Sequence, residues 1–227
     1  MKKLLTTLAF VALAAAGANA SILITQYYEG SSFNKWIEIT NVGPDTIDLG
    51  AGAYKLSLWS NANTEAYKTD GTPNQTMSLT GSLSSGASFL YSHGSTTLPS
   101  YATATSTNSS VINFNGDDSL TLWSGATFTT ASVLDAIGFT DAGNEGTDTS
   151  FVRASVDAGW NTTAGSTALD FPDVWTEVTI ATVDGATAGT DNYLGYSSLV
   201  IPEPSSALLL GAGAAFVVIR RRKTLKK

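Results

Sequence analysis

The chain lacks cysteine altogether and contains a single histidine, His93. Disulfides, thiol nucleophiles and thiolate metal sites are therefore excluded, and one imidazole cannot build a histidine-rich metal site. His93 stands beside Gly94 after an apolar run, without the serine and aspartate arrangement of a catalytic triad, so we expect it in a surface loop. The sequence also has no phosphate-binding glycine loop and no Gly-x-Ser-x-Gly nucleophile elbow. These absences favour a protein that is not an enzyme.

Basic residues are scarce between the two ends of the chain. From Ser21 to Ile201 there are four, against eighteen acidic residues, so this part carries a net charge of −14. The four are Lys35, Lys55, Lys68 and Arg153. A surface this acidic repels nucleic-acid phosphates and anionic lipid headgroups and attracts divalent cations, and it also favours solubility through self-repulsion. The composition therefore argues against a nucleic-acid partner.

Long apolar runs are missing as well, but a short one lies near each end of the chain. The N-terminal run, Leu4–Ala16, follows two lysines and precedes a small-x-small triplet that ends at Ala20. This order is typical of a secretory signal peptide, so it predicts residues 1–20 as the signal, with cleavage between Ala20 and Ser21. An uncleaved anchor is disfavoured because the run is shorter than the roughly 20 residues that span a bilayer.

The C-terminal run, Ser206–Ile219, holds 14 residues, which as a helix would cover about 21 Å of a bilayer core of about 30 Å. The residues before it disfavour a longer helix, because a carboxylate near the membrane is costly and proline withholds a backbone donor. These residues are Pro202, Glu203 and Pro204, and a basic stop follows the run at Arg220, Arg221 and Arg222. Since basic residues stay cytoplasmic, the pattern predicts a marginal transmembrane helix with the body of the protein outside.

This tail resembles the PEP-CTERM sorting domain of Gram-negative bacteria. The Pro-Glu-Pro motif, the small-residue-rich helix and the arginine stop follow one another in the family's order over residues 201–227. The resemblance implies recognition by an exosortase, removal of the tail near the motif, and a transient membrane anchor before delivery to the cell surface or extracellular matrix. It also implies a link to extracellular polysaccharide, with whose production such proteins are associated. A permanent C-terminal anchor is the alternative, although such anchors are usually longer.

The body between the two signals shows almost no helical periodicity. Short β-branched and aromatic runs alternate with turn residues, which is typical of an all-β sandwich or barrel. We expect one domain over residues 21–181, or as far as 195, then a loosely structured Ser/Thr/Gly-rich stem over 182–200, and a long surface loop over 96–110. The expected strands are Ile22–Tyr28, Trp36–Asn41, Thr46–Leu49, Tyr54–Trp59, Met77–Leu79, Ser88–Tyr91, Val111–Phe114, Ser119–Trp123, Val133–Gly138, Ser150–Val152 and Val174–Val178.

The order of these strands resembles the lamin-tail domain, an immunoglobulin-like β-sandwich. The resemblance implies that fold for residues 22–195. It rests on short pieces that follow in the family's order: Tyr28–Gly30, Asn34–Asn41, Ile47–Leu49, Tyr54–Leu56, Leu83–Gly86, Phe89–Tyr91, Phe114–Leu120, Leu134–Gly138, Ser150–Arg153, Trp175 and Tyr193–Gly195. Large rings within strands favour the same assignment, because such rings anchor sandwich cores; we expect this of Trp36, Trp59 and Trp123.

Acidic residues interrupt several of the expected strands. Glu38 lies on the opposite face of its strand from Ile37 and Ile39. Asp135 stands between two apolar residues in a later strand. Because buried charges are normally paired, we expect partners for both carboxylates; Asp135 either serves a turn or pairs with backbone amides or Arg153.

Two acidic loops offer oxygen ligands for calcium, residues 115–118 and residues 141–148. Calcium takes six to eight oxygens, and glycine lets the backbone curl around it. The second loop supplies the side chains of Asp141, Asn144, Glu145 and Asp148. Its spacing does not match an EF-hand, and stretches rich in Asp and Gly also form ordinary turns. No cofactor is required by the sequence, and calcium is the one for which it offers ligands.

These features lead to three hypotheses of function. The first is an exported, exosortase-processed, non-enzymatic interaction protein of the cell surface or extracellular matrix. The second, an accessory module of secreted nuclease or phosphatase systems, follows from bacterial domains similar to lamin tails, although the negative charge opposes direct binding to DNA. The third is a calcium-dependent adhesin.

Overall fold

The computed structural model of the protein describes residues 21–140 and 143–199. Several predicted residues lie outside the described ranges. They are Ala20 at the expected signal cleavage, the calcium candidate Asp141, and the tail residues Pro202, Glu203, Pro204, Arg220, Arg221 and Arg222. Within the two described ranges, every helix falls short of the length and apolar character needed to cross a membrane.

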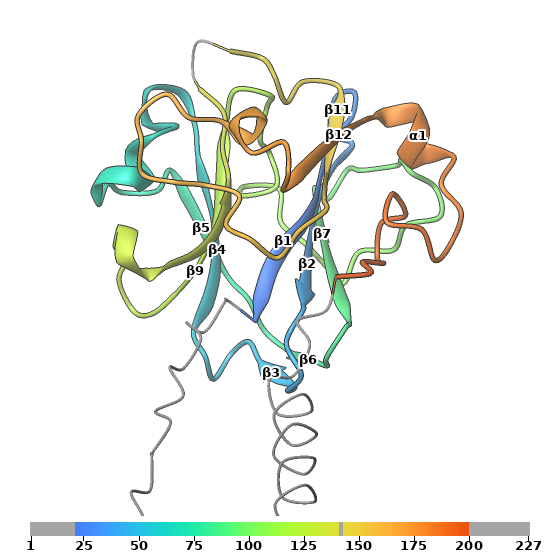
Figure 1. The fold of residues 1–227 in the computed structure, drawn as a ribbon, viewed down its shortest axis with the longest axis horizontal. Coiled ribbons are helices and arrows are strands. Elements are labelled where there is room, and N and C mark those ends of the chain that lie inside the picture. The colour runs from blue at the N-terminus through green and yellow to red at the C-terminus, as the bar shows by residue number, and fades with distance from the viewer. Residues whose placement is uncertain (1–20, 141–142, 200–227) are drawn as a thin grey trace, which may run out of the picture.

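The described chain is built almost entirely of β-strands in two main sheets, which stand side by side in Figure 1. The six-stranded sheet has the order β12 (Trp175–Thr179), β11 (Thr149–Arg153), β1 (Ile22–Glu29), β2 (Lys35–Asn41), β7 (Ser88–Ser92) and β8 (Ser106–Thr107). The four-stranded sheet has the order β10 (Val133–Ile137), β9 (Ser119–Ser124), β4 (Tyr54–Trp59) and β5 (Gln75–Ser78). A small ribbon pairs β3 (Ile47–Asp48) with β6 (Ser82–Leu83). The all-β expectation is confirmed.

The few helices are short. The structure has the 3₁₀ turns η1 (Asn61–Asn63), η2 (Ala66–Thr69), η3 (Thr130–Ser132) and η4 (Ala168–Asp170) and the α-helix α1 (Ile180–Asp184). All strand pairs are antiparallel except β7 and β8.

The core lies between the two sheets and follows the alternation of side chains along the strands. Ile37 and Ile39 of β2 are fully buried there, as the sequence pattern predicts. They share one apolar cluster with Leu56 of β4 and with Leu120 and Leu122 of β9. Burial of each such side chain contributes roughly 1.5–3 kcal/mol, so these facing rows hold the sheets together.

A buried ion pair links the two sheets at one edge. Arg153 of β11 donates from Nη2 to both carboxylate oxygens of Asp135 on β10, at 2.5 Å each. The amide of Ile24, beside a register shift in β1, donates to Asp135 Oδ2 at 2.8 Å, and Arg153 Nε donates to the Ile24 carbonyl at 2.8 Å. The partnership expected for Asp135 is confirmed, with both kinds of partner present.

Two expectations, one about a strand and one about the tryptophans of the core, are wrong. Residues 111–114 form no strand; Val111 and Ile112 are buried in a turn, where their amides donate to the side chain and carbonyl of Asn108. Trp36 and Trp59 are buried in two smaller clusters outside the central core, and Trp123 is not in it either. The three tryptophans lie outside the central core because side chains alternate along a strand. Each tryptophan stands on the strand face opposite the inward-pointing isoleucines and leucines.

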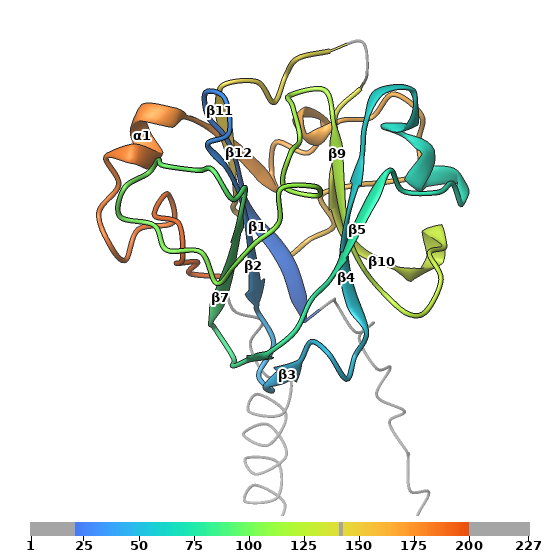
Figure 2. The ribbon, with the colours of Figure 1, turned by 180° about the vertical axis from the view of Figure 1, so that it is seen from behind.

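The outer face of the six-stranded sheet is covered, since every residue of β1 and β2 is buried. The loop after β7 and the segment after β12 lie side by side over this face (Figures 1 and 2). Tyr101 of the loop donates its hydroxyl to the Val183 carbonyl at 2.8 Å, and its ring stacks on Tyr193 with centroids 4.1 Å apart. The expected long loop over residues 96–110 is at the surface, with most of its residues exposed; it also packs over the sheet through Tyr101 and contains β8.

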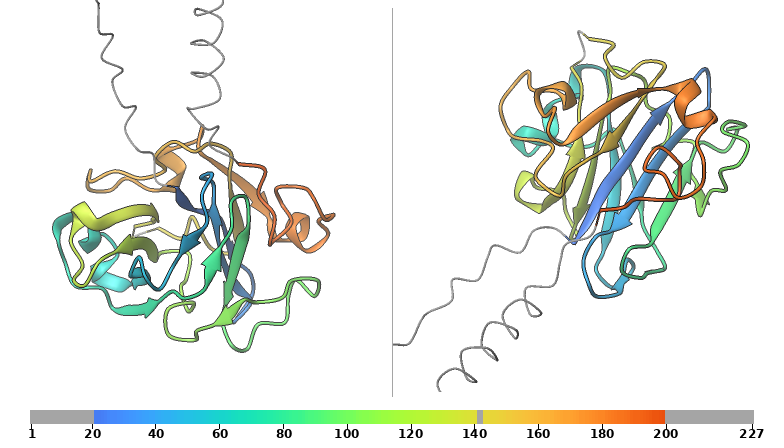
Figure 3. Two further views of the ribbon diagram at one scale, coloured as in Figure 1. Left: turned by 90° about the horizontal axis from the view of Figure 1, so that it is seen from below. Right: turned by 45° about the vertical axis from the view of Figure 1, so that its right-hand side comes forward.

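The segment after β12 runs across the sheet (Figure 3, right) and ends the described chain. Val183 and Leu194 bury their side chains against Tyr28, Trp36 and Leu90. This part of the expected stem therefore packs on the sheet, whereas the domain boundaries remain predictions.

Candidate functional site

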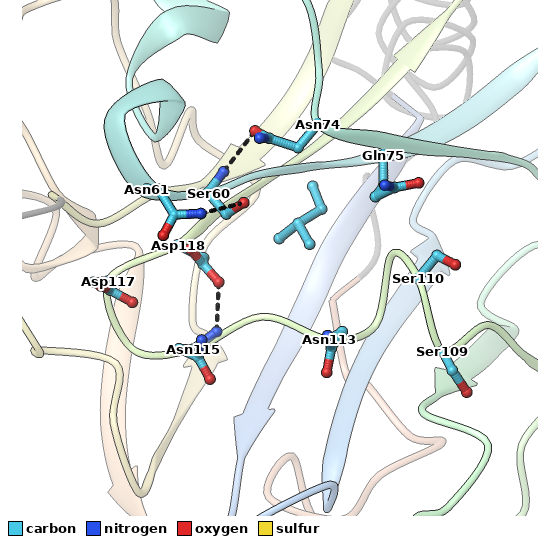
Figure 4. Close-up of a pocket in the computed structure, with 11 residues that line it drawn as sticks. Ser60, Asn61, Asn74, Gln75, Ser109, Ser110, Asn113, Asn115, Asp117 and Asp118 are labelled. Atoms are coloured by element: carbon cyan, nitrogen blue, oxygen red, sulfur yellow. Dashed lines mark hydrogen bonds between the residues drawn. The ribbon is translucent and has the colours of Figure 1, made fainter.

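A polar groove of about 500 Å³ opens between the β4–β5 connection and the segment that precedes β9 (Figure 4). Ten of its eleven lining residues carry polar side chains and none carries a positive charge. The lining consists of Leu58, Ser60, Asn61, Asn74, Gln75, Ser109, Ser110, Asn113, Asn115, Asp117 and Asp118.

The end of β4 and the start of β5 form one wall of the groove. Asn74 accepts the Ser60 amide on its Oδ1 at 2.9 Å, and its own amide donates to the Leu58 carbonyl at 3.0 Å. This side-chain bond holds the connection closed, so the exposed side chain of Gln75 is left facing the groove (Figure 4).

The opposite wall is the turn at residues 115–118, one of the two loops considered for calcium. The Asn115 amide donates to Asp118 Oδ2 at 2.7 Å, and the Asp118 amide returns a bond to the Asn115 carbonyl at 3.0 Å. These bonds use backbone atoms of Asn115, so its exposed side chain is free of the turn. Asn113 is likewise exposed.

Asp118 has the most perturbed carboxylate in the groove. Its pKa is raised to about 6, mainly by burial and also by the charge of nearby Asp117, although hydrogen bonds from the Asn115 and Asn61 amides and the charge of Lys35 act in the opposite direction. With Asp117 beside it, this side of the groove is electronegative. It suits uncharged hydrogen-bonding partners or cations and repels phosphate and sulfate.

The second loop considered for calcium is shown only in part. Asp148 has a left-handed backbone (φ 51°), and its amide donates to buried Glu29 at 2.6 Å, whereas Asn144 accepts the Thr147 amide on its carbonyl at 3.1 Å. Glu145 holds a buried Oε2 with no hydrogen-bond partner among the described residues. Over residues 21–140 and 143–199, no group of three or more His, Asp or Glu side chains is arranged to hold a metal. Because Asp141 lies outside these ranges, calcium at this loop stays a prediction.

His93 differs from the expected surface-loop residue, since its exposed fraction is only 7%. Its ring stacks on Phe33 with centroids 4.4 Å apart, and its Nδ1 accepts the Ser95 amide at 3.0 Å. Burial, with a smaller effect of the Lys35 charge, lowers its pKa. The stacking partner is distant in the sequence, which is why the pattern around His93 does not reveal its burial.

Glu38 is buried on the outer face of the six-stranded sheet without a basic partner among the described residues. Its carboxylate accepts the Thr25 hydroxyl at 2.6 Å, the Thr40 hydroxyl at 3.3 Å and the Gly195 amide at 2.5 Å. Burial raises its pKa to about 7, although these hydrogen bonds oppose the shift. The partners expected for Glu38 are therefore hydroxyls and an amide of the C-terminal segment.

Most groove residues escape sequence reasoning. The amides of Asn61, Asn74, Gln75 and Asn113 come from separate turns and strand ends, and no spacing links them. The only signal in the sequence is the Asn-Gly-Asp-Asp turn, which marks one wall.

Comparison with solved structures finds a similar chain in a DUF4876 family protein from Bacteroides thetaiotaomicron VPI-5482, with 11% sequence identity, coverage of 69% of this chain and 68% of that chain, and a TM-score of 0.43. No curated protein matches the chain. The family model of the PEP-CTERM protein-sorting motif matches residues 200–223. The predicted sorting signal is thus found, and it indicates exosortase-dependent export through a C-terminal membrane anchor that is later cleaved.

Proposed function

We propose that the protein is a non-enzymatic, exported interaction module, which uses the polar groove to bind an extracellular polysaccharide or another surface component at the cell surface or in the extracellular matrix. The observation that carries this proposal is the lining of the groove, where amide and hydroxyl side chains from four separate segments converge. Such groups can donate and accept hydrogen bonds to sugar hydroxyls without requiring a charged ligand.

The position of the groove supports this role. Ser109 in its lining accepts the Gly94 amide at 3.0 Å, which ties the groove to the end of the sandwich where β7 finishes. β1 begins at the other end, and the last described residues also leave from that side (Figure 1). A partner in the groove would therefore approach the face that points away from the route to the sorting motif.

The chemistry of the lining supports binding over catalysis. The groove residues include no histidine, lysine, arginine or tyrosine, so the only ionisable groups are Asp117 and Asp118. One Asp118 oxygen already accepts the amide of its own turn. Cleavage of a glycosidic bond requires a carboxylic acid and a second carboxylate on opposite sides of the bond, whereas these two are neighbours on one turn.

Binding to a panel of neutral and anionic polysaccharides tests this function. We expect the exported protein to bind one or more neutral polymers and to leave them uncleaved. Gln75→Ala and Asn113→Ala should weaken binding by about two- to tenfold each, because each removes hydrogen-bonding groups with no role in the fold. Asn63→Ala, an exposed asparagine outside the groove, is the matched control. Hydrolysis of a polymer, or binding that ignores both groove variants, would contradict the proposal.

A calcium-dependent adhesin is a second candidate, favoured by one observation: Asp118 is 4% exposed, without a basic hydrogen-bonding partner among the described residues, and lies in the groove beside Asp117. A bound cation would relieve the unfavourable burial of that carboxylate. Calcium should then raise the melting temperature relative to a chelator, and Asp117→Asn should remove the rise. An unchanged melting temperature would eliminate this candidate.

We also propose that the two-sheet body is an immunoglobulin-like sandwich of the lamin-tail type. The packed sheets support this, together with the strand sequences that carry the resemblance. An experimental structure tests it, because lamin-tail connectivity must match strand by strand. Intact mass of the native protein tests the two processing steps and any attached glycan at the same time.

A further inference from the structure

A second cavity, of about 290 Å³, lies on the outer face of the six-stranded sheet near the end of β7. Its floor includes Trp36 and Ser92, which are direct partners across β2 and β7, and Thr107 of β8 pairs with Ser92 from the other side. The loop after β7 forms the wall; it is the loop that lies beside α1 in Figure 2. Only the segment around Ser109 separates this cavity from the groove.

Ser92 is the first reason to regard this cavity as a binding site. Its side chain is fully buried, and its Oγ has no hydrogen-bond partner among the described residues, His93 included. Because β7 alternates and Tyr91 points into the core, the Ser92 side chain lies on the cavity side of the sheet. A buried hydroxyl without a partner is rare and costs stability, so its retention at a cavity indicates a partner from outside the chain.

His93 supplies a donor at the same cavity. Its Nδ1 accepts the Ser95 amide, so the neutral ring carries its proton on Nε2. Burial lowers its pKa, which keeps the ring neutral at physiological pH. One face of the imidazole stacks on the ring of Phe33, a residue that is 47% exposed.

The remaining lining is uncharged. It is composed of hydroxyl, glycine, proline and alanine residues together with Trp36: Gly94, Thr96, Thr97, Pro99, Ser100, Ala102, Thr103, Ala104 and Thr107. A charged ligand would lose its hydration here without gaining a counter-charge, whereas an uncharged one would not. Two exposed apolar residues stand beside the lining: Phe33, which stacks on His93, and Leu98, whose amide donates to Asn34 Oδ1 at 3.0 Å.

We propose that this cavity binds one uncharged, hydroxylated ring, such as a neutral sugar residue. The ligand hydroxyls would bond Ser92 Oγ and the Nε2–H of His93, and its C–H face would pack against the apolar lining residues Pro99, Ala102 and Ala104. The proposal does not depend on the groove, because the two cavities share no lining residue.

The unique histidine provides the measurement. Since the chain contains one histidine, its Cε1–H group gives a single resonance in the exported protein, provided that no histidine tag is added. We would titrate the protein with glucose, galactose and N-acetylglucosamine, and with glucuronate as a charged control. At least one neutral sugar should shift the resonance saturably, with a Kd on the order of millimolar, as befits a single sugar residue.

Ser92→Ala is the decisive variant, since it removes a hydroxyl that bonds nothing in the fold and should leave the protein as stable as before. It should weaken the sugar by about two- to tenfold. Ser85→Ala, in an exposed turn far from the cavity, should change nothing. The inference is overturned if no neutral sugar shifts the resonance, if glucuronate binds better than every neutral sugar, or if Ser92→Ala binds as well as the wild type. Loss of polymer binding in Gln75→Ala concerns the groove alone, so the two proposals can fail separately.

Discussion

At the scale of single residues, the most consequential contact is the Asp135–Arg153 pair, because neither side chain is more than 2% exposed. We expect Arg153→Met to destabilise the protein by about 3–5 kcal/mol, since it leaves a buried carboxylate unpaired. Urea denaturation measures this. The double variant Asp135→Leu/Arg153→Met should recover much of the loss, because it removes both charges; equal losses in the single and double variants would show that packing against Trp175 matters more than the charge.

Glu38 gives a second prediction at this scale, which concerns pH. Its pKa is about 7 in the folded protein and 4.5 for the free side chain, so the folded state holds the proton more tightly. The contribution of Glu38 to the free energy of unfolding is therefore fully present below about pH 4.5. This contribution, roughly 3 kcal/mol, is lost as the pH rises through 7.

Denaturation between pH 5 and pH 8 tests this, with Glu38→Gln as the variant. Gln keeps an acceptor for the Gly195 amide and cannot ionise, so the slope of stability against pH should become shallower. Some slope should remain, because burial also raises the pKa of Asp118, to about 6, and of Asp135. A wild-type protein that gains stability from pH 5 to pH 8 would contradict the assignment.

At the scale of elements, the segment after β12 should unfold separately from the two sheets. It is held on the sheet by Val183, Leu194 and a few hydrogen bonds, and elements with few buried contacts open locally. Leu194→Ala should therefore raise the hydrogen-exchange rate of the Gly195 amide while leaving the amides of β1 protected. Leu169→Ala, at a position 46% exposed, is the control. Loss of protection in β1 together with Gly195 would show that the segment and the sheet form one unit.

The elements also show how far the sequence predicts the fold. The strand β4 is predicted to the residue, because apolar Leu56 and Leu58 alternate with polar Lys55 and Ser57 in the sequence itself. Residues 111–114 have the same apolar character but are buried as a turn fixed by Asn108, which local composition does not distinguish from a strand. The two-residue strands β6 and β8 are too short to carry a pattern. The groove and the second cavity, near the end of β7, cannot be predicted from the sequence either, because both are assembled from residues that meet only in the folded chain.

At the scale of the whole molecule, the leading electrostatic effect on stability is the net negative charge. Residues 21–201 carry a net charge of −14, and their mutual repulsion opposes the compact state. Because the Debye length falls from about 30 Å at 0.01 M salt to about 8 Å at 0.15 M, sodium chloride should raise the melting temperature over this range. Binding of a neutral polysaccharide should stay constant over the same range, since no ion pair forms in the proposed complex.

Calcium chloride at matched ionic strength separates general screening from a specific site. If screening accounts for the effect, calcium and sodium should stabilise the protein to a similar extent, and Asp117→Asn should lower neither. A rise with calcium that exceeds the sodium effect and disappears in Asp117→Asn would instead favour the cation-binding candidate. A melting temperature that falls as sodium chloride is added would mean that self-repulsion is not the leading electrostatic effect. The acidic residues would then contribute to stability through their local hydrogen bonds, as Asp118 does in the turn at residues 115–118.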